Sequence, residues 1–106
     1  MVIFLAEGIA SKSQFYDAIR SNCPLVSPLH SNRSWNALAD SLWSGLDEVQ
    51  EEKIAVFWPN PCHLKAAEPD AYAIATDIFT DLSVLLAYPR VTVSRVKMLL
   101  VFKMEN

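Results

Sequence analysis

The side chains best suited to acid–base, nucleophilic or metal chemistry form two small groups in this sequence. Cys62 and His63 are adjacent, with His30 as a second imidazole, and Asp77 and Asp81 lie four residues apart. A cysteine and a histidine can act as nucleophile and base, and two carboxylates on one helix face can act as an acid–base pair. Adjacency alone does not orient a Cys–His pair for proton transfer, and a zinc site takes about four ligands. The sequence hardly supplies that many.

The simpler interpretation of both groups is structural. A partly buried cysteine beside a solvent-facing histidine, and a solvated acidic helix face, need no reaction to explain them. Gly8 and Gly45 are the only glycines, too few for a phosphate-binding loop built on glycine spacing. We expect a protein that is not an enzyme, with no catalytic residues, no metal site and no cofactor. A small thiol enzyme centred on Cys62 and His63 stays a competing hypothesis.

Charge is distributed unevenly along the chain. Residues 40–81 contain nine acidic and two basic residues, a net charge of −7, whereas the remaining residues sum to +4 and the whole chain to −3. Phosphate contacts need clustered lysine and arginine, so nucleic acid is not an expected partner. A basic protein would suit the acidic middle of the chain better.

The tryptophans divide into two kinds. Trp35 falls on an apolar helix stripe and is predicted to lie in the core, and Trp58, at a strand end, is predicted to lie in the core or to cap it. Trp43 lies at the edge of an apolar helix stripe, next to Ser44, where its ring could pack in the core or serve a binding surface.

Length and hydropathy predict one globular domain over residues 1–106. Apolar residues make up 52% of the chain and charged residues 20%, which is enough to bury a core. The longest apolar run, residues 1–6, is far shorter than the roughly 20 residues of a membrane-spanning helix. No basic residue precedes this run and Glu7 follows it, so it makes a poor secretory signal. We expect a cytoplasmic protein with no membrane association and with Cys23 and Cys62 as free thiols.

Apolar runs and helix caps predict the elements that position these residues. Buried strands are expected at 2–5, 54–58 and 98–102, the first of them buried on both faces. Ser11 and Ser34 are predicted to cap helices that end before Pro24 and at Gly45, and Pro69 opens a third helix that ends at Tyr88. Its core-facing stripe is predicted to be Ile74, Ile78, Leu82 and Leu85.

Strands that alternate with helices usually lie parallel and are joined by right-handed crossovers. The predicted fold is therefore α/β, a small three-stranded parallel sheet with covering helices. Residues 62–67 could add one helical turn, and 91–95 are a candidate for an extra edge strand. Residues 24–33 contain two prolines and no sustained periodicity, and are predicted to form a loop with room to carry function.

Residues 34–46 read Ser-Trp-Asn-Ala-Leu-Ala-Asp-Ser-Leu-Trp-Ser-Gly-Leu. This segment resembles the signature helix of the barstar family of ribonuclease inhibitors, which commonly reads Asn-Trp-Asp-Ala-Leu-x-Asp-Cys-Leu. The residues that match are Trp35, Ala37, Leu38, Asp40 and Leu42. The predicted order of strands and helices agrees with the family's architecture over most of the chain.

The resemblance implies a protein that inhibits a small ribonuclease inside the cell that makes it, by filling the cationic active-site cleft with acidic side chains. Asp40 matches the second aspartate of the motif, which in the family enters the nuclease active site. Asn36 stands where the motif has its first aspartate, so it keeps hydrogen-bonding capacity without the charge. Ser34 replaces the motif asparagine and Ser41 the cysteine.

The resemblance also implies contacts outside the motif helix. Residues 78–81 look like the stretch in which the family places another interface carboxylate, which makes Asp81 a second candidate. The preceding loop, in which Ser31 and Asn32 stand where the family often has an aromatic residue and a glycine, would contribute further contacts. The complete set of candidate partner-binding residues is His30, Asn32, Arg33, Asn36, Asp40, Trp43, Ser44 and Asp81. The alternative reading keeps the fold but makes it an immunity or adaptor protein for another basic protein or toxin.

Overall fold

The chain alternates strands and helices in a computed structural model, which describes residues 1–25, 34–88 and 96–105. The elements found in these residues are β1 (Val2–Phe4), α1 (Lys12–Asn22), α2 (Trp35–Glu48), β2 (Lys53–Pro59), α3 (Cys62–Ala67), α4 (Pro69–Leu86) and β3 (Met98–Met104). The strands form a parallel sheet in the order β1-β2-β3. The predicted α/β architecture is therefore confirmed, and the candidate edge strand at 91–95 lies outside the described residues.

The sheet pairs segments that are far apart in the sequence. Val2 lies opposite Ala55, and β2 pairs with β3 along its whole length, from Lys53 with Met98 to Pro59 with Met104. Both β2 and β3 are longer than predicted, because the ladder continues past the apolar runs at 54–58 and 98–102. Pro59 ends β2, where its missing N–H costs little.

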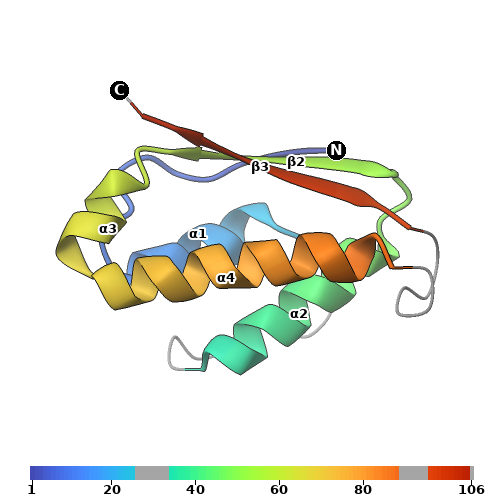
Figure 1. The fold of residues 1–106 in the computed structure, drawn as a ribbon, viewed down its shortest axis with the longest axis horizontal. Coiled ribbons are helices and arrows are strands. Elements are labelled where there is room, and N and C mark those ends of the chain that lie inside the picture. The colour runs from blue at the N-terminus through green and yellow to red at the C-terminus, as the bar shows by residue number, and fades with distance from the viewer. Residues whose placement is uncertain (26–33, 89–95, 106) are drawn as a thin grey trace.

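The helices gather on one side of the sheet, and the other side is uncovered in the described part of the chain (Figure 1). Ile3 is buried under the helices, whereas Val2 and Phe4 on either side of it are exposed. The prediction that the first strand is buried on both faces is therefore wrong. A continuous apolar run does not distinguish a strand between two helix layers from a strand with one bare apolar face.

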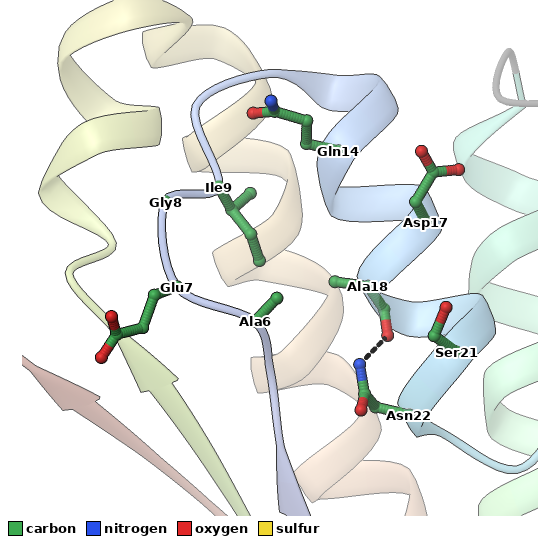
Figure 2. Close-up of a pocket in the computed structure, with 9 residues that line it drawn as sticks. All are labelled: Ala6, Glu7, Gly8, Ile9, Gln14, Asp17, Ala18, Ser21 and Asn22. Atoms are coloured by element: carbon green, nitrogen blue, oxygen red, sulfur yellow. Dashed lines mark hydrogen bonds between the residues drawn. The ribbon is translucent and has the colours of Figure 1, made fainter.

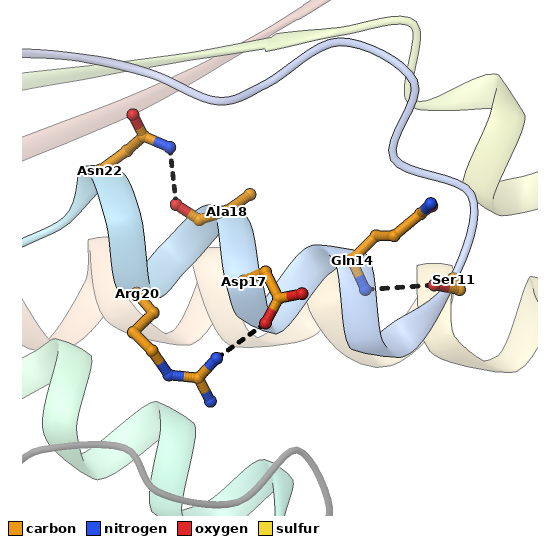
Figure 3. A network of polar contacts seen from close by, with 6 residues as sticks. All are labelled: Ser11, Gln14, Asp17, Ala18, Arg20 and Asn22. Atoms are coloured by element: carbon orange, nitrogen blue, oxygen red, sulfur yellow. Dashed lines mark hydrogen bonds and ion pairs between the residues drawn. The ribbon is translucent and has the colours of Figure 1, made fainter.

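The turn after β1 and the start of α1 follow from local backbone chemistry. Gly8 has φ 78°, in the left-handed region that favours glycine, and so turns the chain toward α1 (Figure 2). Ser11 caps α1, because its side chain accepts a hydrogen bond from the Gln14 amide at 3.1 Å (Figure 3). The Gln14 side chain accepts a hydrogen bond from the amide of Ala10 at 2.8 Å, which completes a variant of the capping box.

Helix α2 begins where the sequence predicts and ends later. Ser34 caps it by accepting a hydrogen bond from the Ala37 amide at 3.1 Å. The helix continues past Gly45 to Glu48, so the prediction that Gly45 ends it is wrong. Gly45 is needed for a different reason: a Cβ there would overlap the Pro24 carbonyl and lie 2.9 Å from the Leu25 nitrogen. The glycine allows the chain that leaves α1 to cross directly over α2.

Helix α4 buries a stripe that shares only Leu82 with the predicted one. Its buried residues are Ala71, Ala75, Phe79, Leu82 and Leu86, whereas Ile74 and Leu85 are exposed. Apolar side chains surround most of this helix, so periodicity alone could not identify the side that meets the sheet. The prediction was wrong for Ile74 and Leu85, whereas Leu82 is buried as predicted. Part of the predicted stripe returns below as the lining of a groove.

Aromatic rings in the core connect the sheet to three helices. Trp58 of β2 is fully buried, as predicted, and its ring lies 5.4 Å from Phe15 of α1 and 6.1 Å from Phe79 of α4. Phe15 in turn lies 6.0 Å from Trp35, the first residue of α2. This chain of ring contacts fixes the beginning of α2 relative to the sheet.

The close approach at Gly45 gives a stability prediction. Replacing glycine by alanine inside a helix normally stabilises it by about 1 kcal/mol. We expect Gly45→Ala instead to lower the free energy of unfolding by about 1–3 kcal/mol, because the new methyl group overlaps Pro24. Urea unfolding followed by circular dichroism measures the change. Ser21→Ala, at an exposed position of α1, is the control, and a stabilised Gly45→Ala variant would contradict the prediction.

Candidate functional site

A groove with a volume of about 510 Å³ runs between α2 and α4. Its lining residues are Ala39, Asp40, Trp43, Ser44, Ile78, Asp81, Leu82 and Leu85. The sequence had selected four of these as partner-binding candidates, three from α2 and one from α4. Two helices far apart in the sequence therefore bring them into one depression.

Helical periodicity explains how each wall forms. Asp40, Trp43 and Ser44 are three and four residues apart and so share one side of α2. On α4 the same spacing puts Ile78, Asp81 and Leu85 on one side. Two of these, Ile78 and Leu85, belong to the stripe that the sequence assigned to the core. The exposed Leu85 thus lies in the wall of the groove, whereas the exposed Ile74 and Val84 lie outside its lining.

The charged groups of the groove are carboxylates. Asp40 and Asp81 are both exposed, one from each wall, and the other lining residues are uncharged. No lysine or arginine lines the groove in the part of the chain that the structure describes. Two carboxylates above apolar side chains favour a cationic group that also has an apolar surface.

Trp43 contributes apolar surface to the groove. The residue is half-buried, and its indole Nε1 is fully buried with no hydrogen-bond partner among the described residues. The exposed part of the ring is therefore carbon. The sequence left open whether Trp43 packs in the core or serves a binding surface. In the structure one part of the ring packs against the core and another part lines the groove.

The remaining candidates lie outside this lining. Asn36 is exposed in the first turn of α2, one helical turn before Asp40. His30, Asn32 and Arg33 fall outside the described residues, in the segment that precedes α2. They remain sequence predictions.

A second hollow lies between the turn at Gly8 and α1, and three of its polar side chains are engaged in bonds at or near α1 (Figure 2). Asp17 pairs with Arg20 at 2.8 Å, and the Asn22 amide donates to the Ala18 carbonyl at 2.8 Å (Figure 3). Gln14 accepts a hydrogen bond from the backbone, as described above. These side chains stabilise α1, so we assign them no binding role.

The thiol and metal hypotheses find no support in the geometry. Cys62 is exposed at the start of α3, where its hydrogen bond to the Glu105 side chain raises the pKa of the thiol. A raised pKa disfavours the thiolate, which is the nucleophilic form. Burial raises the pKa of Cys23 to about 12. No cluster of three metal-ligating side chains occurs within residues 1–25, 34–88 and 96–105.

One positioning interaction was missed by the sequence reasoning. Lys97 is buried, and its Nζ donates to the Asp47 carbonyl oxygen at 2.7 Å and lies 3.9 Å from Asp47 Oδ1. A cation at the last turn of α2 satisfies a terminal carbonyl and complements the helix dipole. The signal in the sequence is weak, because a lysine before an apolar strand ordinarily marks its solvent-exposed edge.

The sequence model of the family described as Barstar (barnase inhibitor) matches residues 1–96. The chain belongs to the barstar family. The match includes both walls of the α2–α4 groove and confirms the resemblance at residues 34–46. Its description makes the barstar family one of inhibitors, which act by binding another protein.

No match was found among curated proteins or among solved structures. Within the described residues, none of the helices combines the length and the apolar character that a membrane crossing requires.

The buried contact between Lys97 and Asp47 gives a second stability prediction. We expect Lys97→Met to lower the free energy of unfolding by about 3 kcal/mol, because it removes the cation that faces a buried carboxyl group and a helix end. Urea unfolding measures the loss. Lys65→Met, at an exposed position of α3, should change it by less than about 0.5 kcal/mol. Equal effects of the two substitutions would refute the structural role of Lys97.

The raised thiol pKa values predict low reactivity. At about pH 8 we expect iodoacetamide to alkylate Cys62 more slowly than a cysteine of the unfolded chain, and Glu105→Gln to speed this reaction. Cys23 should react only on unfolding. The free energy of unfolding should also fall above pH 9.0, because the unfolded chain loses the Cys23 proton there and the folded chain only near 12. An unusually fast Cys62 would revive the thiol-enzyme hypothesis.

Proposed function

We propose that this protein is a non-enzymatic, cytoplasmic inhibitor of a small ribonuclease and blocks the cationic active-site cleft with the acidic helix α2, which forms one wall of the α2–α4 groove, and the adjacent loop. The observation that carries the proposal is the meeting of Asp40 and Asp81 in one groove of a barstar-family chain. The expected partner is a ribonuclease or another basic protein.

The electrostatics of the two surfaces fit together. A ribonuclease cleft is cationic because it binds the phosphates of RNA, so carboxylates held on rigid helices can occupy its phosphate subsites. Long-range attraction speeds the encounter and weakens as salt screens it. The net charge of −7 over residues 40–81 supports such steering.

Each candidate has a distinct role in this proposal. Asp40 would pair with a lysine or arginine in the cleft, and Asp81 would form a second, peripheral charge contact. Trp43 and Ser44 would supply apolar contact and a hydrogen-bonding hydroxyl beside Asp40. Asn36 would accept or donate a hydrogen bond where the family motif carries a charge. His30, Asn32 and Arg33 would add contacts from the loop, as the sequence predicts.

Asn36 also favours a second candidate function. An uncharged amide pairs more weakly with a cationic catalytic residue than a carboxylate does. A barstar-family immunity or adaptor protein that binds a basic toxin other than a nuclease would tolerate this exchange. The groove and its two carboxylates would serve either partner.

Binding measurements on charge variants test the proposed surface. The purified protein is titrated against cationic microbial ribonucleases by isothermal calorimetry at low and high ionic strength. We expect Asp40→Asn to weaken binding by about ten- to a hundredfold, since a hydrogen bond to a charged group contributes about 1.5–3 kcal/mol. Asp81→Asn should have a smaller effect, and high salt should weaken binding by the wild-type chain.

Glu7→Gln is the matched control. It removes one carboxylate from the exposed turn after β1, away from the groove, and should leave the affinity nearly unchanged. If Asp40→Asn and Glu7→Gln bind equally well, the α2–α4 groove is not the inhibitory surface. Binding to a basic non-nuclease toxin, together with none to any ribonuclease, would establish the second function instead.

A further inference from the structure

The side of the sheet opposite the helices presents large apolar side chains. We call this surface the bare sheet face, and it consists chiefly of Val2, Phe4, Met98, Leu100, Phe102 and Met104. These residues are between 39% and 63% exposed. In the described part of the chain no helix covers them (Figure 1).

A ladder of aromatic rings crosses the middle of this face. Phe57 of β2 stacks on Phe4 of β1 and on Phe102 of β3, with ring centroids 5.1 Å apart and an interplanar angle of 17° on each side. The three residues are register partners, so the ladder runs perpendicular to the strands. Cross-strand pairs of this kind stabilise a sheet. Strand alternation determines which side these three residues face, but it does not require all three to be aromatic.

The bare sheet face carries almost no charge. Alternation along β2 places Lys53, Ala55 and Phe57 on the same side, and Lys53 stands at one end of the strand. The corresponding positions of β1 and β3 hold apolar residues only. A strongly basic partner, such as the one proposed for the groove, has no carboxylate to meet here. The partner surface that suits this face is therefore uncharged and similar in shape.

The size of the face suits a protein interface. At these exposed fractions the six side chains present on the order of 600 Å² of apolar surface, taking about 150–250 Å² for a whole large side chain. That is at the upper limit of about 300–600 Å² for the largest apolar patch of an ordinary monomer, and approaches the roughly 800 Å² that each partner contributes to a standard interface. Phe57 and the half-buried Ala55 add to it.

We propose that the bare sheet face is a dimer interface and that its occupant is the same face of a second copy of this chain. A two-fold interface puts one surface against itself, which requires a face without like-charge repulsion, and this one meets that condition. Two sheets would pack about 10 Å apart with the phenylalanine ladders interdigitated.

The dimer leaves the α2–α4 grooves free. Helix α2 lies on the far side of the molecule from the bare sheet face, beyond α4 (Figure 1). Both grooves of the dimer would therefore point outward, each open to its own partner. Dimerisation itself does not depend on what the groove binds.

Sedimentation velocity over a range of protein concentrations tests the proposal. We expect a concentration-dependent dimer of the wild-type chain and at least a tenfold weaker dimer for Leu100→Lys. Val84→Lys is the matched control, because Val84 is an exposed apolar residue on α4, away from the sheet. Phe4→Thr, which keeps a strand-forming residue, is a second variant, and circular dichroism shows whether each variant folds.

Three outcomes would overturn the proposal. The first is a wild-type chain that stays monomeric at all concentrations. The second is that the Leu100→Lys and Phe4→Thr variants dimerise as strongly as the Val84→Lys control. The third is a monomer that binds phosphatidylcholine vesicles and loses this binding in Leu100→Lys, which would assign the face to a lipid surface. A dimer weakened only by the two sheet variants supports it.

Discussion

The contacts of the buried Trp58 ring set the arrangement on which the other features depend. The ring belongs to the central strand, and its neighbours Phe15 and Phe79 come from α1 and α4. Phe15 also contacts Trp35, so the first turn of α2 is held through two aromatic side chains rather than by direct pairing with the sheet. All of these rings lie on one side of the sheet. The core is therefore one-sided, which leaves α2 outermost on one surface and an apolar sheet on the other.

Features that depend on nearby residues were predicted well from the sequence. Features that depend on contacts between distant segments were predicted poorly. Ser11 and Ser34 cap helices as expected, because capping depends on residues only three positions away. Gly45 was misread as a helix end, since its role depends on Pro24, which no local pattern connects with it. The burial of β1 on one face only could not be predicted either. Periodicity reports that a residue is apolar, but the partner that covers it comes from elsewhere in the chain.

In the candidate site, too, local features were predictable from the sequence and long-range contacts were not. Asp40, Trp43 and Ser44 follow from one helical segment, so a motif in the sequence could select them together. Their meeting with Asp81 in one groove depends on how α4 packs beside α2, which no pattern within either helix reports. Lys97 was missed, because a buried lysine has no distinguishing neighbour in sequence: its partner Asp47 lies 50 residues earlier.

The order of the strands has a consequence for how the chain folds. The central strand β2 pairs with β1, more than fifty residues before it, and with β3, whose last residue is Met104. Parallel pairs this distant close slowly, because a large loop must be ordered before any contact forms. During synthesis from the N-terminus, one edge of β2 stays unpaired until β3 has been made. We expect folding to be slow for a chain of this length, and the open edge of β2 to be the point at which nascent chains are most exposed to association.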